Sequence, residues 1–306
     1  DDLSGIRVHD CLTDSNGDKW LVTAVDNGLH QLTVTDQEVN TGNPASGTGT
    51  AGAWYTTIGL WDNGADRDLV LLDQNEICEI HGDPDDSASV IHMQWGSGPS
   101  NTILITVPED LRHTGVAGTG IKSNADINLY TTGYVTVEYL EFENGGVVQG
   151  LWNGSTPGDV VVRNNIFHNA NGDTGILVAG TGTWKVYNNI LYNMNPTSHM
   201  QNAITVDNDL TGSAYIYNNT IYLDSDTYNQ ACICNYADTT QYTVDVSNNL
   251  LANVGDANGT WCVYYPVGKA PTGDYNIATD STVPGVNSLV NQNLEQIHWS
   301  LRRGLD

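Results

Sequence analysis

Four similar segments follow one another between residues 159 and 253, and in each of them apolar and polar residues alternate before an Asn-Asn pair. Successive pairs are 24, 30 and 30 residues apart, counted from Asn165 to Asn189, Asn219 and Asn249. Alternation with a period of two predicts β-strands, and repeats of this length predict one supersecondary unit each, stacked on its neighbours. The four segments occupy residues 159–167, 183–191, 213–221 and 243–251.

The alternation also predicts which side chains face the core of the stack. Successive side chains of a strand point to opposite faces, so alternate residues form an inward column and the residues between them face out. The predicted inward column consists of Val160, Val162, Trp184, Val186, Ala214, Ile216, Val244 and Val246. The predicted outward set consists of Val161, Arg163, Lys185, Tyr187, Tyr215, Tyr217, Asp245 and Ser247.

The first asparagine of each pair falls where the strand must turn. Asparagine tolerates left-handed backbone, and its amide both donates and accepts hydrogen bonds. Stacked at the inter-strand spacing of about 4.8 Å, such residues form a ladder that satisfies the polar groups of the bend. The residues predicted to form this ladder are Asn164, Asn188, Asn218 and Asn248.

A second strand follows each pair, at residues 175–178, 203–206, 231–234 and 261–264. With these strands the chain resembles the right-handed parallel β-helix of the pectate-lyase-like superfamily, over roughly residues 66–280. It looks most like the short-coil, Asn-Asn-rich members found in phage and environmental sequences. The resemblance implies an all-β, right-handed parallel β-helix solenoid, and it says little about function.

The sequence around the repeat predicts further parts. Short alternating runs separated by turns predict a small antiparallel β domain that serves as an adaptor, and a Gly- and Thr-rich stretch has the composition of a linker. Two short helical patterns predict caps or docking segments. The predicted parts are the meander at 1–40, the linker at 41–53, the capped β-helix at 54–285 and a C-terminal helical segment at 286–306.

The early part of the predicted β-helix is less regular. Trp54, Ile58 and Trp61 share one helical face, which we expect to cover the open end of the core. The strands predicted after this helix occupy Leu69–Leu72 and residues 77–80, 90–93, 102–107, 127–129 and 134–137.

The net charge of the chain argues against some classes of binding partner. It has 36 acidic and 10 basic residues, a formal net charge of −26, which argues against nucleic acid or an anionic membrane as a partner. No apolar run reaches the length of about 18 residues that a membrane span requires. The chain begins with Asp-Asp instead of Met, so we expect a processed chain or a fragment. The resemblance to phage β-helices implies an extracellular or virion location.

Two acidic turns are candidate calcium sites, with a plain solvated turn as the alternative for each. The first matches the start of a calcium loop, yet Lys19 stands where the loop requires glycine and Val25 where it requires Glu. The candidate calcium ligands are Asp14, Asn16 and Asp18 in the first turn and Asp83, Asp85 and Asp86 in the second.

Three of the five cysteines, Cys232, Cys234 and Cys262, fall in one predicted column. A zinc site and a disulfide between Cys232 and Cys262 remain open. The Cys-x-Cys spacing lacks the usual two-residue gap of a zinc site. Buried free thiols that pack as small apolar groups are therefore the favoured interpretation.

The resemblance also raises an enzyme hypothesis, the cleavage of an acidic polysaccharide. Lyases of this type use calcium-holding carboxylates and a basic residue, but only Arg163 and Lys185 are basic on the outward face of the regular coils, two strand positions apart in register. The motifs of polygalacturonase-like hydrolases are incomplete, and His168 and His199 are predicted to lie in turns. A secreted polysaccharide lyase or glycoside hydrolase is therefore the alternative function.

Outward tyrosines spaced by one coil favour a different function. Such rings stack on sugars, although tyrosine also suits a half-exposed sheet. The expected function is a non-enzymatic structural or glycan-binding surface protein. By resemblance it is a virion fibre, spike or capsid decoration that meets other structural subunits, copies of itself or a surface glycan. The predicted glycan-binding residues are Arg163, Lys185, Tyr187, Tyr192, Tyr215, Tyr217 and Tyr222.

Overall fold

The structure is a computed structural model, and it describes the chain in fifteen stretches. The chain divides into two compact units, residues 1–64 and 65–306. Each unit is described below by itself. The described stretches are residues 10–13, 19–26, 31–36, 50–53, 58–65, 68–84, 90–130, 132–143, 147–150, 158–170, 174–194, 202–224, 230–254, 261–266 and 269–292.

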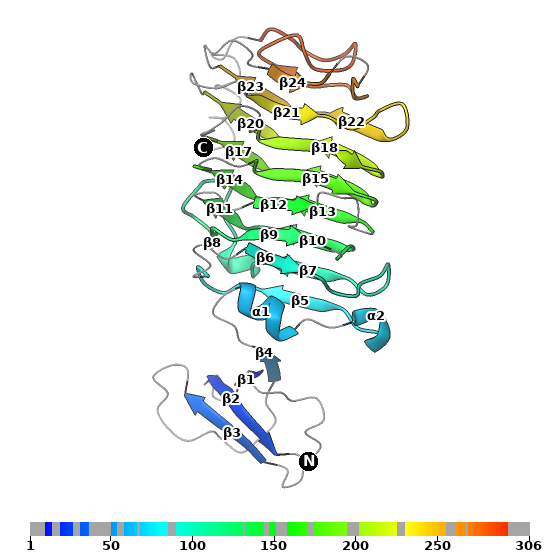
Figure 1. The fold of residues 1–306 in the computed structure, drawn as a ribbon. Coiled ribbons are helices and arrows are strands. Elements are labelled where there is room, and N and C mark those ends of the chain that lie inside the picture. The colour runs from blue at the N-terminus through cyan, green and yellow to red at the C-terminus, as the bar shows by residue number, and fades with distance from the viewer. Residues whose placement is uncertain are drawn as a thin grey trace. The chain divides into compact units, whose positions relative to one another are not determined.

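The N-terminal unit contains a four-stranded antiparallel sheet with the order β3-β2-β1-β4 (Figure 1). Its first three strands confirm the predicted meander. The fourth strand lies in the predicted linker and pairs along its whole length with β1, so the linker prediction is wrong for residues 50–53. The strands are β1 (Asp10–Thr13), β2 (Lys19–Asp26), β3 (Gln31–Asp36) and β4 (Thr50–Ala53).

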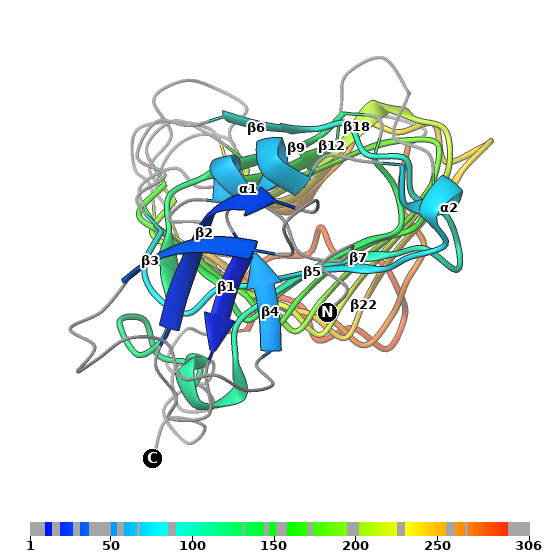
Figure 2. The ribbon, with the colours of Figure 1, turned by 90° about the horizontal axis from the view of Figure 1, so that it is seen from below.

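The second unit is a parallel β-solenoid, as Figures 1 and 2 show. It is built from three seven-stranded sheets. Each coil contributes one strand to each sheet, and every strand except the first and last of a sheet pairs in parallel with its counterparts in the coils before and after. The first sheet consists of β5 (Glu76–Glu79), β7 (Ile103–Thr106), β10 (Val135–Glu138), β13 (Val160–Arg163), β16 (Thr183–Tyr187), β19 (Ser213–Tyr217) and β22 (Thr243–Ser247).

The other two sheets complete each coil. The second sheet consists of β8 (Lys122–Ser123), β11 (Glu141–Glu143), β14 (Ile166–His168), β17 (Ile190–Tyr192), β20 (Thr220–Leu223), β23 (Leu250–Asn253) and β25 (Ile277–Ala278). The third sheet consists of β6 (Val90–Met93), β9 (Asp126–Leu129), β12 (Val147–Gly150), β15 (Ile176–Gly180), β18 (Ile204–Leu210), β21 (Ala231–Asn235) and β24 (Trp261–Tyr264).

Three short helical elements accompany the sheets: α1 (Ile58–Ala65), α2 (Leu69–Leu72) and the 3₁₀ turn η1 (Glu109–Leu111). The prediction of a strand at Leu69–Leu72 is wrong. Asp68 caps this segment as a helix, because its Oδ1 accepts a hydrogen bond from the Leu71 N–H at 2.9 Å. The helix ends at Asp73, which adopts left-handed backbone.

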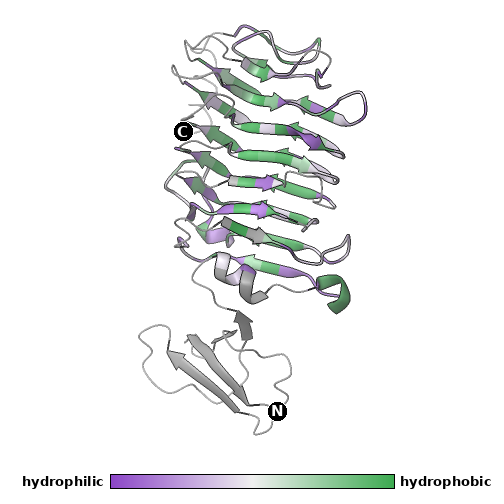
Figure 3. Ribbon diagram, viewed as in Figure 1, coloured by the Kyte–Doolittle hydropathy of each residue, from purple (hydrophilic) through white to green (hydrophobic). Residues whose placement is uncertain are grey.

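Apolar side chains line the interior of the solenoid. Hydrophobic residues recur along its strands, as the colours of Figure 3 show. All eight residues of the predicted inward column are at most 1% exposed, which confirms the alternation argument. Trp184 is the largest of them, and its Nε1–H donates to the Ala179 carbonyl at 2.9 Å. Gly150 makes room for it, because a Cβ there would lie 2.9 Å from Trp184 Cζ2.

The Asn-Asn pairs turn the chain from the first sheet into the second. The first asparagine of each pair adopts left-handed backbone, with φ between 55° and 56°, as predicted. The polar ladder, however, runs one residue later than predicted. It consists of the second asparagines, Asn165, Asn189, Asn219 and Asn249, and extends to Asn276.

Each rung of this ladder connects three coils. The Oδ1 of Asn189 accepts from the backbone N–H of Asn165 at 3.0 Å and from its side-chain amide at 3.3 Å, while the Nδ2 of Asn189 donates to the Val162 carbonyl at 2.9 Å. The predicted ladder at Asn164, Asn188, Asn218 and Asn248 is therefore wrong, since those residues supply the left-handed turn and their successors point inward.

The C-terminal part of the described chain is irregular. Residues 286–292 contain no helix, and the helical pattern of the predicted C-terminal segment, residues 293–304, lies outside the described residues. Leu289 forms an isolated parallel bridge with Ile277, the first residue of β25. In the part of the chain that the structure describes, no helix is long and apolar enough to cross a membrane.

Candidate functional site

The outer face of the first sheet carries two rows of side chains that follow directly from the strand register. The network row, as we call the outer row nearest the asparagine bend, contains Glu138, Arg163, Tyr187, Tyr217 and Ser247. The central row lies two residues earlier on each strand and contains Ile77, Leu104, Thr136, Val161, Lys185, Tyr215 and Asp245.

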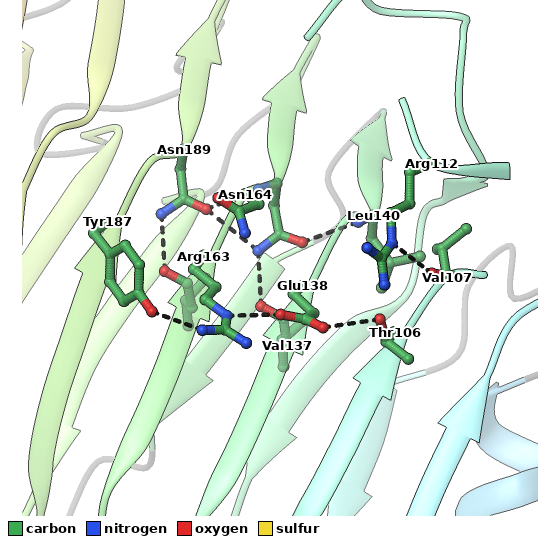
Figure 4. A network of polar contacts seen from close by, with 12 residues as sticks. Thr106, Val107, Arg112, Val137, Glu138, Leu140, Arg163, Asn164, Tyr187 and Asn189 are labelled. Carbon is green, nitrogen blue, oxygen red and sulfur yellow. Dashed lines mark hydrogen bonds and ion pairs between the residues drawn. The ribbon is translucent and has the colours of Figure 1, made fainter. Parts of the chain in front are cut away.

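Arg163 is the centre of the polar network in Figure 4. Its Nε donates to Glu138 Oε2 at 2.6 Å, and its Nη1 donates to the Tyr187 hydroxyl at 2.9 Å. The Thr106 hydroxyl donates to the other carboxylate oxygen of Glu138 at 3.1 Å. The hydrogen bond with Tyr187, followed by the pair with Glu138, raises the pKa of Arg163 above its ordinary value.

This network changes the role expected of Arg163. The Glu138 side chain is 7% exposed, so its negative charge depends on the guanidinium for compensation. The charge of Arg163 is thus already matched within the protein, and it is not free to attract a ligand carboxylate. The sequence interpretation missed Glu138, although its place in the repeat aligns it with Arg163.

Tyr187 and Tyr217 stack on one another, with ring centroids 4.8 Å apart and an interplanar angle of 6°. Their register was predicted correctly. One ring face of each residue is covered by the other tyrosine, and a stacked sugar needs an open ring face. Stacking therefore leaves at most one ring face of each tyrosine for a ligand.

Lys185 and Tyr215 form the open part of the face. They are register neighbours on β16 and β19, and both are exposed, Tyr215 by 37%. In the described part of the solenoid, Arg112, Lys122, Arg163 and Lys269 each form an ion pair, a hydrogen bond or a cation–π contact, whereas Lys185 shows none. A cation beside an exposed aromatic ring is the arrangement on this sheet best suited to a polar ring-shaped ligand.

The remaining two predicted residues lie on another sheet. Tyr192 and Tyr222 are register neighbours on the outer face of the second sheet, past the asparagine bend. Tyr192 stacks on His168, with ring centroids 5.3 Å apart. Burial raises the pKa of both tyrosines. The seven predicted glycan-binding residues are thus divided, five on the first sheet and two on the second.

The structure also contains a buried carboxylate–histidine pair that the sequence did not indicate. Glu141 is 0% exposed and His168 is 5% exposed, and His168 Nε2 lies 2.7 Å from Glu141 Oε1. The prediction that His168 lies in a turn is wrong, since it ends strand β14. Aligning Phe142 with Phe167, which stack at 4.6 Å, would have placed Glu141 near this strand.

Of the six candidate calcium ligands, the structure describes only Asp83. Asp14, Asn16, Asp18, Asp85 and Asp86 lie outside the described residues. Asp83 is described, and its Oδ1 accepts a hydrogen bond from the Lys122 N–H at 2.8 Å. Among the described residues no three His, Cys, Asp or Glu side chains come together as a metal site would require.

The three clustered thiols are buried and free of disulfides. Cys232 and Cys262 occupy matching places on β21 and β24, between the register pairs Ala231–Trp261 and Ile233–Val263. Burial raises the pKa of Cys232, and burial raises the pKa of Cys234 to about 12. The hydrogen bond with Cys232 lowers the pKa of Cys262. The thiols of Cys232 and Cys234 are therefore protonated at neutral pH, as buried packing groups are.

Comparisons of this chain with family models, with curated proteins and with solved structures find no match. The identification of the fold therefore rests on the strand register and on the asparagine ladder themselves.

Proposed function

We propose that the protein is a non-enzymatic structural surface protein that binds a glycan on the outer face of the first sheet. The observation that carries the proposal is the exposed pair of Lys185 and Tyr215 beside the stacked tyrosines of the network row. Tyr215 supplies an apolar ring face for a sugar, and the lysine ammonium and the Tyr187 and Tyr217 hydroxyls supply polar contacts.

A neutral glycan suits this face best. The chain carries a formal net charge of −26, which repels polyanions over distances longer than one coil at low ionic strength. Lys185 is a single compensating cation, and Arg163 is already matched by Glu138. The ligand class that we propose is a neutral pyranose-containing chain whose sugar rings stack on Tyr215.

The arrangement gives less support to the alternative of an acidic-glycan lyase or hydrolase. A hydrolase needs two carboxyl groups facing one glycosidic bond. The register neighbours of Lys185 are Val161 and Tyr215, and the nearest carboxylate of its row is Asp245, one coil further on. In the same proposal, and by likeness to phage β-helices, the protein is a fibre, spike or capsid decoration, extracellular or on a virion.

Binding of neutral and uronate-containing oligosaccharides, measured by calorimetry, tests the proposal. We expect Tyr215→Ala to weaken binding of a neutral oligosaccharide by about twofold to tenfold, because a stacking aromatic ring contributes about 0.5–1.5 kcal/mol. Tyr265→Ala is the matched control, since Tyr265 is 36% exposed and lies in the loop after β24. Equal losses in both variants, or no loss in either, would refute the binding face.

The structural half of the proposal needs a separate measurement. Light scattering and imaging of the native protein report its oligomeric state and its association with particles. A defined oligomer or a regular lattice supports a virion component. A free monomer that cleaves acidic polysaccharide, with or without calcium, would instead favour the enzyme.

A further inference from the structure

The connection between β7 and β8 makes an unusual excursion, residues 108–120, which we call the strap. The strap covers part of one register row on the outer face of the second sheet, and the burial of residues in this row indicates which part. Glu141 and Ile166 belong to this row and are 0% exposed, although their positions face outward, whereas Ile277 in the same row is 37% exposed. A Cβ on Gly115 of the strap would lie 3.9 Å from Ile190 Cδ1, so the strap reaches the row.

His113 fastens the middle of the strap to the asparagine bend. Its Nε2 lies 2.8 Å from the Asn164 carbonyl oxygen, and its Nδ1 accepts from the Gly115 N–H at 3.3 Å. A carbonyl accepts and an N–H donates, so both contacts are satisfied only by the neutral ring with its proton on Nε2. A second proton, on Nδ1, would face the Gly115 N–H and abolish that hydrogen bond.

Glu141 fastens the far end of the strap. Its Oε2 accepts from the Gly118 N–H at 2.7 Å, while its Oε1 faces His168 Nε2. The buried carboxylate thus joins the strap to strand β14. Tyr192 closes the far side of His168 by ring stacking.

The charged groups around His113 come from several elements. Arg112 of the strap itself lies over the Tyr139 ring, 3.9 Å from its centroid, and that ring lies 6.5 Å from His113. Glu141 faces His113 from β11, with His168 behind it. Lys122 and Glu143 pair with each other at 3.3 Å in the same sheet.

We propose that residues 108–120 form an acid-released strap, closed when His113 is neutral and opened when His113 takes up a second proton. Release uncovers Ile166, Ile190 and the Glu141–His168 pair. The outer face of the second sheet then gains an apolar ledge next to Tyr192.

The direction of the pH dependence follows from burial. Burial lowers the pKa of His113 below its ordinary value, and this effect exceeds the opposing contributions of the hydrogen bond with the Asn164 carbonyl and of the charge of Glu141. With the strap open, the pKa of His113 returns to its ordinary value. Below that pH the open state binds more protons than the closed state, so the closed strap loses stability as the pH falls and keeps it at higher pH.

Amide hydrogen exchange of the full chain tests the strap. Exchange of residues 111–120, corrected for the intrinsic pH dependence, is compared at about pH 7.5 and about pH 5, which bracket the ordinary histidine pKa. We expect exchange of the strap to increase several-fold at the lower pH while the strands β13 and β16 stay protected. In His113→Gln, whose amide donates but does not titrate, this increase should vanish.

His81→Gln is the matched control, because His81 is an exposed histidine that also meets a carboxylate, Glu79, at 3.1 Å. This variant should keep the wild-type pH dependence. A strap that exchanges equally at both pH values in the wild type would overturn the proposal. So would an unchanged increase in His113→Gln, which would assign the effect to another group.

Discussion

The regular coils after residue 159 and the earlier coil that contains β10 and β11 turn the same corner with different residues. At this corner Tyr139 aligns with Asn164, and Leu140 aligns with the ladder residue Asn165. Tyr139 adopts left-handed backbone with a φ of 64°, close to the 55° of Asn164. The geometry of the bend is thus retained although neither asparagine is present.

The two regions differ in what stabilises the bend. In the regular coils an asparagine amide bonds the coil before and the coil after, so one residue type repeated at one place is sufficient. In the earlier coil Leu140 is fully buried, and its N–H provides the last donor to the ladder, at 3.0 Å from Asn165 Oδ1. Arg112 of the strap covers the Tyr139 ring instead. Repetition is replaced by contacts specific to that coil.

Removal of a ladder amide should have the largest effect on the unfolding free energy. Asn219→Ala deprives the Asn189 N–H and amide of their acceptor and the Val186 carbonyl of a donor, all in a buried bend. We expect a loss of about 3 kcal/mol in unfolding free energy, measured by urea unfolding followed by circular dichroism. Thr243→Ala, at an exposed strand end, is the control, and a similar loss there would contradict the ladder argument.

Extending the ladder by one coil toward the N-terminus should destabilise the protein. Leu140→Asn would place an amide one coil earlier, but its Oδ1 would face position 108 by the register of Val137 with Ile105, and Pro108 has no N–H. A buried acceptor without a partner costs about 2 kcal/mol. Thermal unfolding of the variant checks this, and a rise in melting temperature would show that the earlier coil accepts the ladder.

Substitution of an asparagine with left-handed backbone should have the smallest effect on the unfolding free energy. Asn188→Ala should cost about 1 kcal/mol, because alanine resists a φ of 56°, whereas Asn188→Gly should be nearly neutral. Both variants are compared in the same unfolding experiment. Equal unfolding free energies of the alanine and glycine variants would show that the left-handed backbone at position 188 does not contribute to the stability difference between residue types.

The sequence predicted the regular coils well because their determinants are local. Alternation and the Asn-Asn pair stand next to each other in every repeat, and the register follows from them. Which of two adjacent asparagines turns inward is not written in the sequence, and the ladder was therefore misplaced by one residue. A run of four apolar residues at Leu69–Leu72 fits a helix as well as a strand, and the Asp68 cap decides it.

The candidate site was less predictable, because its decisive partners are distant in sequence. Arg163 was recognised as an outward residue, but its neutralisation by Glu138 depends on a contact across 25 residues. His113 meets Asn164 across 51 residues, by way of an excursion that breaks the repeat. The repeat pattern predicts the structure of the regular coils. It does not predict the contacts of the strap, because the strap is not part of the repeat.

The last ladder rung that the structure describes ends in a hydroxyl. Among the described residues no asparagine follows Asn276 in the ladder, and its N–H donates instead to the Ser288 hydroxyl at 3.1 Å, which in turn donates to the Pro284 carbonyl at 2.6 Å. A hydroxyl thus stands where the next amide would continue the series. In polymer terms each asparagine is a propagating group and Ser288 is the terminator, so a coil inserted before Asn276 would lengthen the protein without a new end having to be built.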